Sequence, residues 1–401
     1  AIHNNKHADH VKPLGSTFSM LSAFRNYNTF SLQTSLQSNP VSQLREIRRN
    51  SSYRSNHDQS GSEPAIFNIV KLKLGEEYLN FLKGKKDIDE AKDAVNSLKM
   101  VNDINNKLEL LNLKFYIELT DLRTWSYEFR FYDTKNEQDL GDINSLSAGQ
   151  KSIMHLIFEA YGRDDVNGGL IIIDEPELSL HPSLQKRLSK LFIEYSKDRQ
   201  IIISTPSTYF IDIDALSNGA ALVRVTSGGE GTKIYQLSDS SKNLISNLAK
   251  GNLYNPHTWG LDAREFFFQE DGIILVEGQE DVLLYPKIAE QLEKEFKGSF
   301  WGWGAGGADN IPYLCGIAKD LGFKKVVSIL DGDKQDKFQS LQESFPEYHF
   351  EIIPADDIRT KSARDAVEEK QGLLNKKMIL KEEFHNNVNS IIDNINCYLQ
   401  S

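Results

Sequence analysis

The fold is decided by an apolar run that ends in acids, LIIIDEPE at residues 170–177. Four aliphatic residues in succession predict a buried strand of a parallel sheet, because helices cover both faces of such strands. The strand delivers Asp174 and Glu175 at its carboxyl end, where open α/β sheets bind their ligands. An amphipathic helix around residues 184–195 and a second apolar strand at 201–203 follow, which is the alternation of an α/β domain.

The upstream segment LSAGQ, which starts at Leu146, resembles the signature motif of ABC-type ATPases. In that motif a serine and a glycine at a helix N-terminus face a γ-phosphate, because exposed N–H groups and the helix dipole attract anions. The resemblance implies that Glu175 orients or deprotonates the attacking water. It also implies at least a dimer, since a signature serine acts on nucleotide bound to the opposite subunit. The residues that it assigns to ATP and its Mg²⁺ are Ser147, Gly149, Gln150 and Asp174.

Two features depart from the ATPase pattern. The segment EPELSLHP at residues 175–182 is similar to the branch that contains SMC-like and OLD (overcoming lysogenization defect) proteins, where a histidine senses the γ-phosphate after the next strand. Here Pro206 holds that position, and His181 is either a compensating residue or simply the start of a helix. The sequence contains no Gly-x-x-x-x-Gly-Lys-Ser/Thr phosphate loop, and we expect a segment that carries this loop to precede Ala1.

A second pair of apolar strands also ends in acids. The strand GIILV precedes Glu277 and Asp281, and the strand VVSIL precedes Asp331 and Asp333. If these strands are parallel neighbours, their carboxylates converge and repel one another unless hard divalent cations neutralise them. The pattern therefore predicts Mg²⁺ or Mn²⁺, which can activate water and stabilise the leaving oxygen of a phosphodiester.

This second arrangement resembles the Toprim domain of topoisomerases, primases and OLD-type nucleases. Asp281, four residues after Glu277, matches the additional acid of the OLD branch, as does the segment GGADN at residues 306–310. The resemblance implies catalytic and metal-binding roles for Glu277, Asp281, Asp331 and Asp333.

Further charged and aromatic residues are open to two interpretations. Asp356 or Asp357 completes a second metal site, and Lys361 holds the scissile phosphate, or all three are surface charges. Trp301 and Trp303 are packing residues or, in the alternative, stack on bases.

The order of the two constellations resembles OLD-family proteins, which are ATP-regulated, metal-dependent DNA nucleases, many of them in antiphage defence. The resemblance implies a homo-oligomeric DNA endonuclease that uses Mg²⁺ or Mn²⁺ and ATP, with a helicase-like or reverse-transcriptase-linked protein as a further partner. The alternative is a nucleotide-switched DNA clamp or scaffold that does not cleave. A primase or topoisomerase is a weaker interpretation, because a topoisomerase needs a domain with a tyrosine nucleophile.

The expected fold class is α/β, with an ABC-type ATPase domain of mixed or parallel sheet, incomplete at its N-terminus, followed by a Rossmann-like Toprim domain. Residues 1–63 are a polar, basic, partly flexible segment of the ATPase domain, and residues 64–262 are its remainder, including a buried strand at 221–225. Residues 263–401 are the Toprim domain, with a helical tail over 362–399.

Composition excludes several classes of protein. The chain has 401 residues with 39% hydrophobic and 26% charged, which excludes a wholly disordered or fibrous chain, and 57 acidic against 46 basic residues give a formal charge of −11. No apolar run reaches the length of about 18 residues that a membrane span needs. The two cysteines argue against a disulfide framework and favour a cytoplasmic protein.

Overall fold

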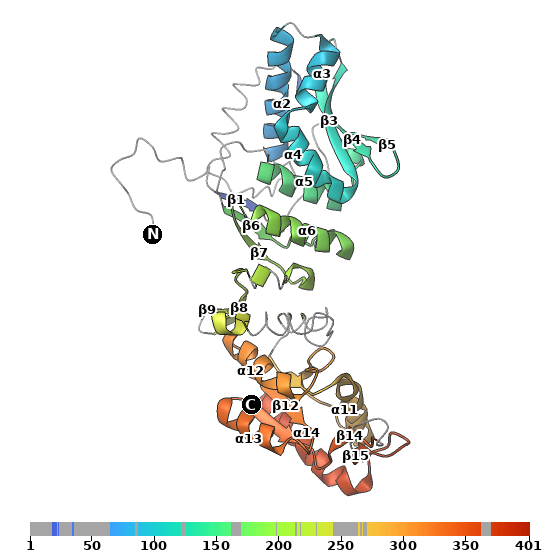
Figure 1. Cartoon of the computed structure of the whole chain (residues 1–401), viewed down its shortest axis with the longest axis vertical. Coiled ribbons are helices and arrows are strands. Elements are labelled where there is room, and N and C mark those ends of the chain that lie inside the picture. Colours follow the sequence, from blue (N-terminus) through green and yellow to red (C-terminus); the bar gives the residue numbers. More distant parts are fainter. Residues whose placement is uncertain are drawn as a thin grey trace, which may run out of the picture. The chain divides into compact units, whose positions relative to one another are not determined.

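The computed structural model divides into two compact units, between Phe210 and Ile211, which are described separately below (Figure 1). The described residues are 18–21, 23, 34–35, 65–84, 87–121, 123, 126–161, 170–197, 199–212, 215–216, 218–229, 231–243, 264, 267, 271–361 and 370–401. The polar segment 36–63 and most of the connector before residue 271 lie outside them, and the predicted domain boundaries stay predictions. No helix within the described ranges is both long and apolar enough to cross a membrane.

The first unit contains the parallel sheet that the sequence predicts. Its strands run in the order β1-β6-β7 and are β1 (Phe18–Leu21), β6 (Leu170–Asp174) and β7 (Gln200–Ser204). Helix α6 (Pro182–Tyr195) lies between β6 and β7 in the chain, as a parallel connection requires. The 3-10 turn η5 (Thr208–Phe210) follows β7.

A second, antiparallel sheet completes this unit, which thus contains one parallel and one antiparallel sheet. Its elements are β2 (Thr34–Ser35), β3 (Leu113–Asp121), β4 (Ser126–Asp133) and β5 (Gln138–Gly141), with β4 paired to each of the others. Helices pack around it in Figure 1. These helices are α2 (Ala65–Lys83), α3 (Ile88–Asn96), α4 (Lys99–Leu108) and α5 (Ala148–Tyr161). The short turns η3 (Glu109–Leu111) and η4 (Ile143–Ser145) flank the sheet.

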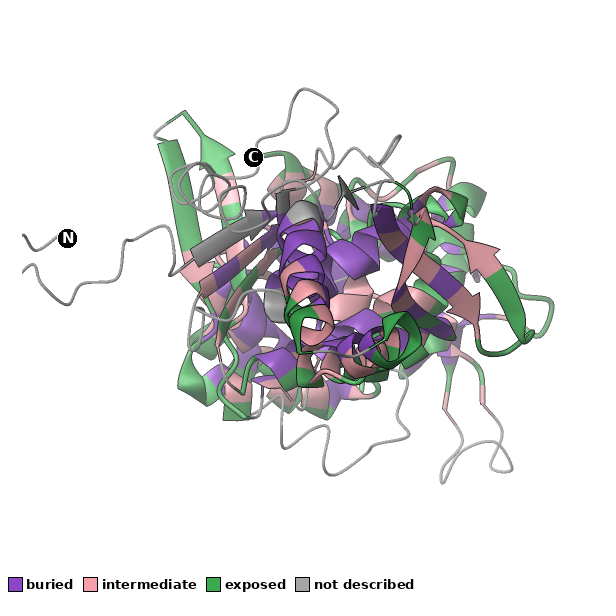
Figure 2. Cartoon of the chain, turned by 90° about the horizontal axis from the view of Figure 1, so that it is seen from above, coloured by how far each residue is buried: buried purple, intermediate pink, exposed green. Residues whose placement is uncertain are grey.

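An aromatic cluster forms the centre of the first core. The ring of Phe158 on α5 lies 5.0 Å from that of Phe67, 5.7 Å from that of Phe115 and 5.6 Å from that of Phe129, between centroids. All four side chains are buried. Figure 2 colours the buried residues purple, and they lie on the helices and strands. Tilted and edge-on ring pairs of this kind add to the free energy of burial.

The second unit is built on a four-stranded parallel sheet in the order β11-β10-β12-β13. The strands are β10 (Ile273–Leu275), β11 (Ser299–Phe300), β12 (Val326–Leu330) and β13 (His349–Ile352). Every pair is parallel. The order places β10 and β12, the two strands that lead to acids, side by side at the centre of the sheet.

Helices cover both faces of this sheet, because alternate strand residues point in opposite directions. Ile273 and Leu275 join one core with α12 (Ile311–Asp320) and α13 (Gln335–Ser344). The intervening Ile274 joins the other core with α11 (Gln279–Gln291) and α14 (His385–Gln400). A parallel sheet with helices on both faces confirms the Rossmann-like prediction. The turns η7 (Ala308–Asn310) and η8 (Glu382–Phe384) precede α12 and α14.

Two secondary-structure predictions were wrong. The apolar run at 221–225 is not a buried strand of the ATPase sheet: β8 (Val223–Gly228) pairs antiparallel with β9 (Gly231–Gln236), and Val225 is 61% exposed. The tail is only partly helical, because β15 (Gly372–Leu374) pairs with β14 (Asp357–Arg359) and the helix begins at residue 385. Residues 362–369 lie outside the described part of the chain.

Substitution of Phe158 by alanine should lower the free energy of unfolding by about 3–5 kcal/mol, because it removes the ring that contacts three others and leaves a cavity. Urea denaturation followed by circular dichroism measures this change. Ile202→Ala in the same unit is the control: Ile202 is 47% exposed, so its truncation should change stability by no more than about 0.5 kcal/mol. Equal effects of the two variants would contradict the assignment of this core.

Candidate functional site: acids at the ends of parallel strands

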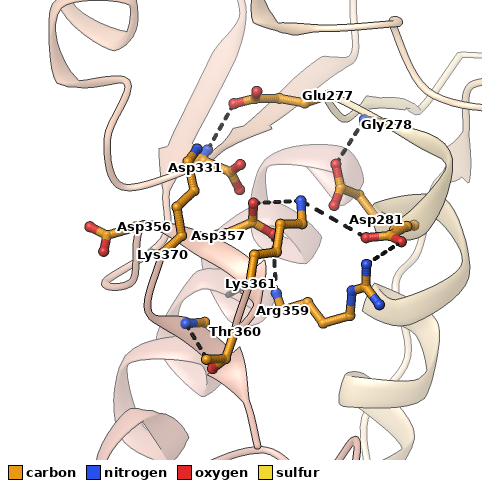
Figure 3. Close-up of polar contacts among 12 residues, drawn as sticks. Glu277, Gly278, Asp281, Asp331, Asp356, Asp357, Arg359, Thr360, Lys361 and Lys370 are labelled. Carbon is orange, nitrogen blue, oxygen red and sulfur yellow. Dashed lines mark hydrogen bonds and ion pairs between the residues drawn. The ribbon is translucent and has the colours of Figure 1, made fainter. Parts of the chain in front are cut away.

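Two neighbouring strands of the second unit deliver acids to one edge of their sheet. β10 and β12 are in register with Leu275 beside Ser328, so their carboxyl ends lead to Glu277 and Asp331. The Oε1 atom of Glu277 accepts a hydrogen bond of 3.1 Å from the backbone N–H of Asp331, shown in Figure 3. This bond joins the two strand ends directly.

Asp281 combines a structural role with a position inside this group of acids. It lies in the first turn of α11, and its Oδ2 accepts a hydrogen bond of 2.8 Å from the N–H of Gly278. An acid here satisfies an otherwise unpaired N–H and complements the helix dipole. The residue is 8% exposed. Burial, together with the charges of Glu277 and Asp357, raises its pKa to about 7.

Asp331 is the most strongly perturbed acid of the group. Burial raises its pKa to about 9, and the neighbouring charges of Glu277, Asp281 and Asp357 act in the same direction. Burial also raises the pKa of Glu277. Carboxylates in low-dielectric surroundings resist sharing negative charge, so the site holds protons or attracts cations.

The structure distinguishes between the two adjacent aspartates after β13. Asp357 is 3% exposed and accepts a bond of 2.6 Å from the Nζ of Lys361. Asp356 is exposed, accepts an N–H from Gln371 at 3.2 Å, and points away from the other acids in Figure 3. Asp357, not Asp356, therefore belongs to the carboxylate group.

Asp333 forms ion pairs with two lysines, and one of them, Lys370, was not among the site residues predicted from the sequence. Its Oδ1 lies 2.9 Å from the Nζ of Lys334, and its Oδ2 lies 2.7 Å from the Nζ of Lys370. Burial alone would raise the pKa of Asp333, but these two ammonium groups lower it. A pair of backbone hydrogen bonds, 3.1 and 3.0 Å, holds Lys370 beside Lys361. Lys370 is distant in sequence, and only the pairing of β14 with β15 brings it to the site.

The loop after β11 supports the same edge of the sheet. The N–H groups of Ala305 and Gly307 donate to the carbonyls of Val276 and Glu277, each at 2.8 Å. Gly304 has a φ of +81°, and a side chain there would collide with the backbone of Gly278 at 2.6 Å. The predicted OLD-like segment at 306–310 therefore begins beside Glu277.

The first unit carries its own acids at the end of β6. Asp174 is in register with Ser204, and the N–H of Glu175 donates to the carbonyl of Ser204 at 2.8 Å. Glu175 has a φ of +48°, which a non-glycine residue rarely adopts. The Oε2 of Glu177 accepts a bond of 2.6 Å from the hydroxyl of Thr205. The two strand ends are thus locked together as in the second unit.

The signature segment forms the beginning of α5. The Ser147 hydroxyl accepts the N–H of Gln150 at 3.3 Å, and the Gln150 side chain accepts the N–H of Ser147 at 2.9 Å, which is a reciprocal capping box. Gly149 faces the chain after the acids, because a β-carbon there would lie 2.6 Å from the Ser179 carbonyl oxygen. The signature helix and the acidic turn are therefore in close contact.

The structure favours the simpler interpretation of His181. This residue is the N-cap of α6, and its Nδ1 accepts the N–H of Ser183 at 3.3 Å. Pro206, at the position of the expected histidine, is exposed after β7.

Comparison with known families gives two matches, one to each part of the chain. A model described as an AAA ATPase domain matches residues 12–211, and a model described as an overcoming lysogenization defect protein-like TOPRIM domain matches residues 267–333. The chain joins an AAA ATPase domain to an OLD-like TOPRIM domain. The predicted order of an ATPase domain followed by a Toprim domain is thereby confirmed, and the second match confirms the resemblance to OLD proteins.

Individual proteins show more distant similarity. Endonuclease GajA from Bacillus cereus (strain VD045) is 24% identical over 208 residues, which are 49% of this chain and 33% of that protein. This chain thus spans a third of the length of the curated relative that it matches. The SMC head domain from Thermotoga maritima is 19% identical with a TM-score of 0.28, over 36% of this chain and 50% of that one. A Pyrococcus furiosus Smc head domain with an extended coiled coil, bound to the C-terminal domain of ScpA, is 16% identical with a TM-score of 0.30. The match covers 53% of this chain and 55% of that one.

The donor atoms of the TOPRIM site fit a hard divalent cation. The grouped side chains are carboxylates, the oxygen ligands that Mg²⁺ and Mn²⁺ prefer, and Asp281, Asp331 and Asp357 are buried. Within the described residues, no three acidic, histidine or cysteine side chains lie close enough together to enclose an ion as they stand. The assignment of individual metal ligands stays a prediction.

Asp331→Asn should stabilise the metal-free protein, and increasingly so as pH rises. Unfolded, the carboxyl loses its proton near its ordinary pKa of 3.8, whereas folded it keeps the proton to about pH 9. The unfolded state therefore binds fewer protons between these values, and wild-type stability falls as pH rises through them. In buffer with a chelator, the variant should gain at least about 1 kcal/mol near pH 8, or roughly 2–4 °C in Tm. Thermal melts at several pH values measure the difference in Tm between the variant and the wild type. A difference that does not change with pH would contradict a raised pKa of Asp331.

Gly149→Ala should destabilise the ATPase domain by about 1–3 kcal/mol, because the new methyl group meets the Ser179 carbonyl and must displace backbone. Gly316→Ala is the matched control in another helix. A β-carbon at Gly316 has no neighbour within 4 Å, so this variant should gain about 0.5–1 kcal/mol from the better helix propensity of alanine. Chemical denaturation measures both changes, and the same sign for both would contradict the packing described here.

Proposed function

We propose that this protein is an ATP-regulated, divalent-metal-dependent DNA endonuclease that hydrolyses phosphodiester bonds at its TOPRIM site and acts in antiphage defence. The observation that carries the proposal is the bond between Glu277 and the N–H of Asp331 at the ends of adjacent parallel strands, with buried Asp281 and Asp357 beside it. The match to the OLD-like TOPRIM model and the partial similarity to a protein named as an endonuclease support it. The defence role rests on the family resemblance alone.

The chain's own residues divide the work between binding cations and binding phosphate. Glu277, Asp281, Asp331, Asp333 and Asp357 supply the carboxylates for Mg²⁺ or Mn²⁺, which when bound provides charge for an attacking water and a leaving oxygen. Three cations border these acids and are suited to a phosphate: Lys361, Lys370 and Lys334. Ion pairs hold their side chains in place before substrate arrives, which lowers the entropy cost of binding.

The ATPase domain is proposed to control this site through dimerisation. Ser147 and Gly149 at the start of α5 face the γ-phosphate of a nucleotide on a second copy of the chain, since the positive end of the helix dipole attracts an anion. Asp174 holds Mg²⁺ and Glu175 orients water, a role that suits its constrained backbone.

A second candidate is a nucleotide-switched DNA clamp that does not cleave. Pro206 favours it, because proline has no side chain that can sense a γ-phosphate. A plasmid assay separates the candidates, since a clamp binds DNA without nicking it.

The double substitution Asp331→Ala and Asp333→Ala should abolish cleavage of supercoiled plasmid with Mg²⁺ or Mn²⁺, with oligomer size unchanged. A sharper comparison uses the adjacent pair after β13. Asp357→Asn should lower the cleavage rate by about 10- to 100-fold, whereas Asp356→Asn, whose side chain points away, should keep nearly full activity. Agarose gels with and without ATP measure nicking. Undiminished cutting by the double variant would sink the assignment.

A further inference from the structure

Two tryptophans separated by a single glycine occupy opposite environments. Trp301 is 2% exposed and belongs to the core beneath β10, whereas Trp303 is 42% exposed. Gly302 and Gly304 have φ values of +45° and +81°, and the Gly304 N–H donates to the Trp301 carbonyl at 3.0 Å. This tight turn anchors one indole in the core and presents the other at the surface.

The turn is attached to the backbone that carries the catalytic acids. Gly304 packs so closely on Gly278 that no β-carbon would fit between them. Gly278 in turn donates its N–H to Asp281 and follows Glu277 directly. Trp303 therefore directly precedes Gly304, the residue that packs against Gly278 at the edge of the carboxylate group.

Two lysines, one on α13 and one just before it, form ion pairs with an acid of the site and with an acid of the segment that follows the turn. Lys337 forms an ion pair with Asp309, which follows the turn in the chain. Lys334, three residues earlier, pairs with Asp333. Proteins bind single-stranded nucleic acid by combining exposed aromatic rings, which stack on bases, with basic side chains that follow the phosphates.

We propose that Trp303 stacks on an unpaired nucleobase next to the scissile phosphate, and so positions a single-stranded or frayed DNA segment in the TOPRIM site. This inference rests on the proposed nuclease function and adds a substrate preference to it. Every base presents a π-face, so the subsite accepts any base and selects strand state instead of sequence. Trp303 is a positioning residue and takes no part in proton or metal chemistry.

The test measures binding of a fluorescent single-stranded oligodeoxynucleotide of about 12 nucleotides to the whole chain in a chelating buffer, where no cleavage occurs. Trp303→Ala and Trp303→Leu should weaken binding on the order of tenfold, and Trp303→Phe should retain most of the affinity because it keeps an aromatic face. Quenching of tryptophan fluorescence by an unlabelled oligonucleotide should fall in all three variants. The leucine variant separates stacking from apolar contact.

Met378→Ala is the matched control, since Met378 is 43% exposed and its carbonyl is bound by Gln291 at the far end of α11. It should bind and quench like wild type. Unchanged affinity and quenching in the Trp303 variants would overturn the inference, as would conversion of an oligomer to a monomer by Trp303→Ala, which would make the residue a protein contact. Failure of wild type to nick plasmid, with quenching that depends on Trp303, would overturn the nuclease function and leave the base subsite standing.

Discussion

The second unit depends on holding mutually repelling carboxylates at one edge of a parallel sheet. The register of β10 and β12, continued two residues past Leu275, places Glu277 beside Leu330 and next to Asp331. The N–H of Asp331 then donates to Glu277, which compensates part of a charge that burial disfavours. The rest of the repulsion between the acids is offset by the burial of apolar side chains on both faces of the sheet, which holds the strands in place.

The first unit also joins two parallel strand ends at its acids, but through different hydrogen bonds. Glu175 and Glu177 are tied to the end of β7 through the Ser204 carbonyl and the Thr205 hydroxyl. The signature helix meets this acidic turn through Gly149, a position where any side chain would separate the two. The acidic turn and the start of the signature helix therefore pack as one piece.

The sequence predicts those parts of the sites that strands carry and misses those that tertiary pairing brings in. Apolar runs followed by acids predict β6, β10 and β12 with their carboxylates, because a parallel strand delivers its next residue to a fixed edge. Lys370 has no such signal, since its position depends on a bridge to Lys361. The choice between Asp356 and Asp357 likewise depends on which side chain turns inward, and adjacent residues give no pattern.

The predictions for residues 221–225 and for the two tryptophans failed or stayed open for one physical reason. An apolar stretch of sequence does not show which part of the protein packs against it. The run at 221–225 has the composition of a core strand, yet it forms a two-stranded hairpin, with Arg224 over the ring of Phe323 on one face and Val225 exposed on the other. Trp301 and Trp303 have similar neighbours in the sequence, and the turn through Gly302 and Gly304, both with positive φ, places one side chain in the core and the other at the surface.

Neutralisation within the TOPRIM site bears on the proposed binding of DNA by an acidic chain. The lysines at the site are paired with Asp333 and Asp357, so their charge is available to a phosphate only when another cation satisfies those acids. Phosphate affinity and metal affinity are therefore linked, and by reciprocity each must strengthen the other. In the proposed enzyme, the positive charge that a phosphate meets at this edge therefore comes with the bound cation, in a chain whose formal charge is −11.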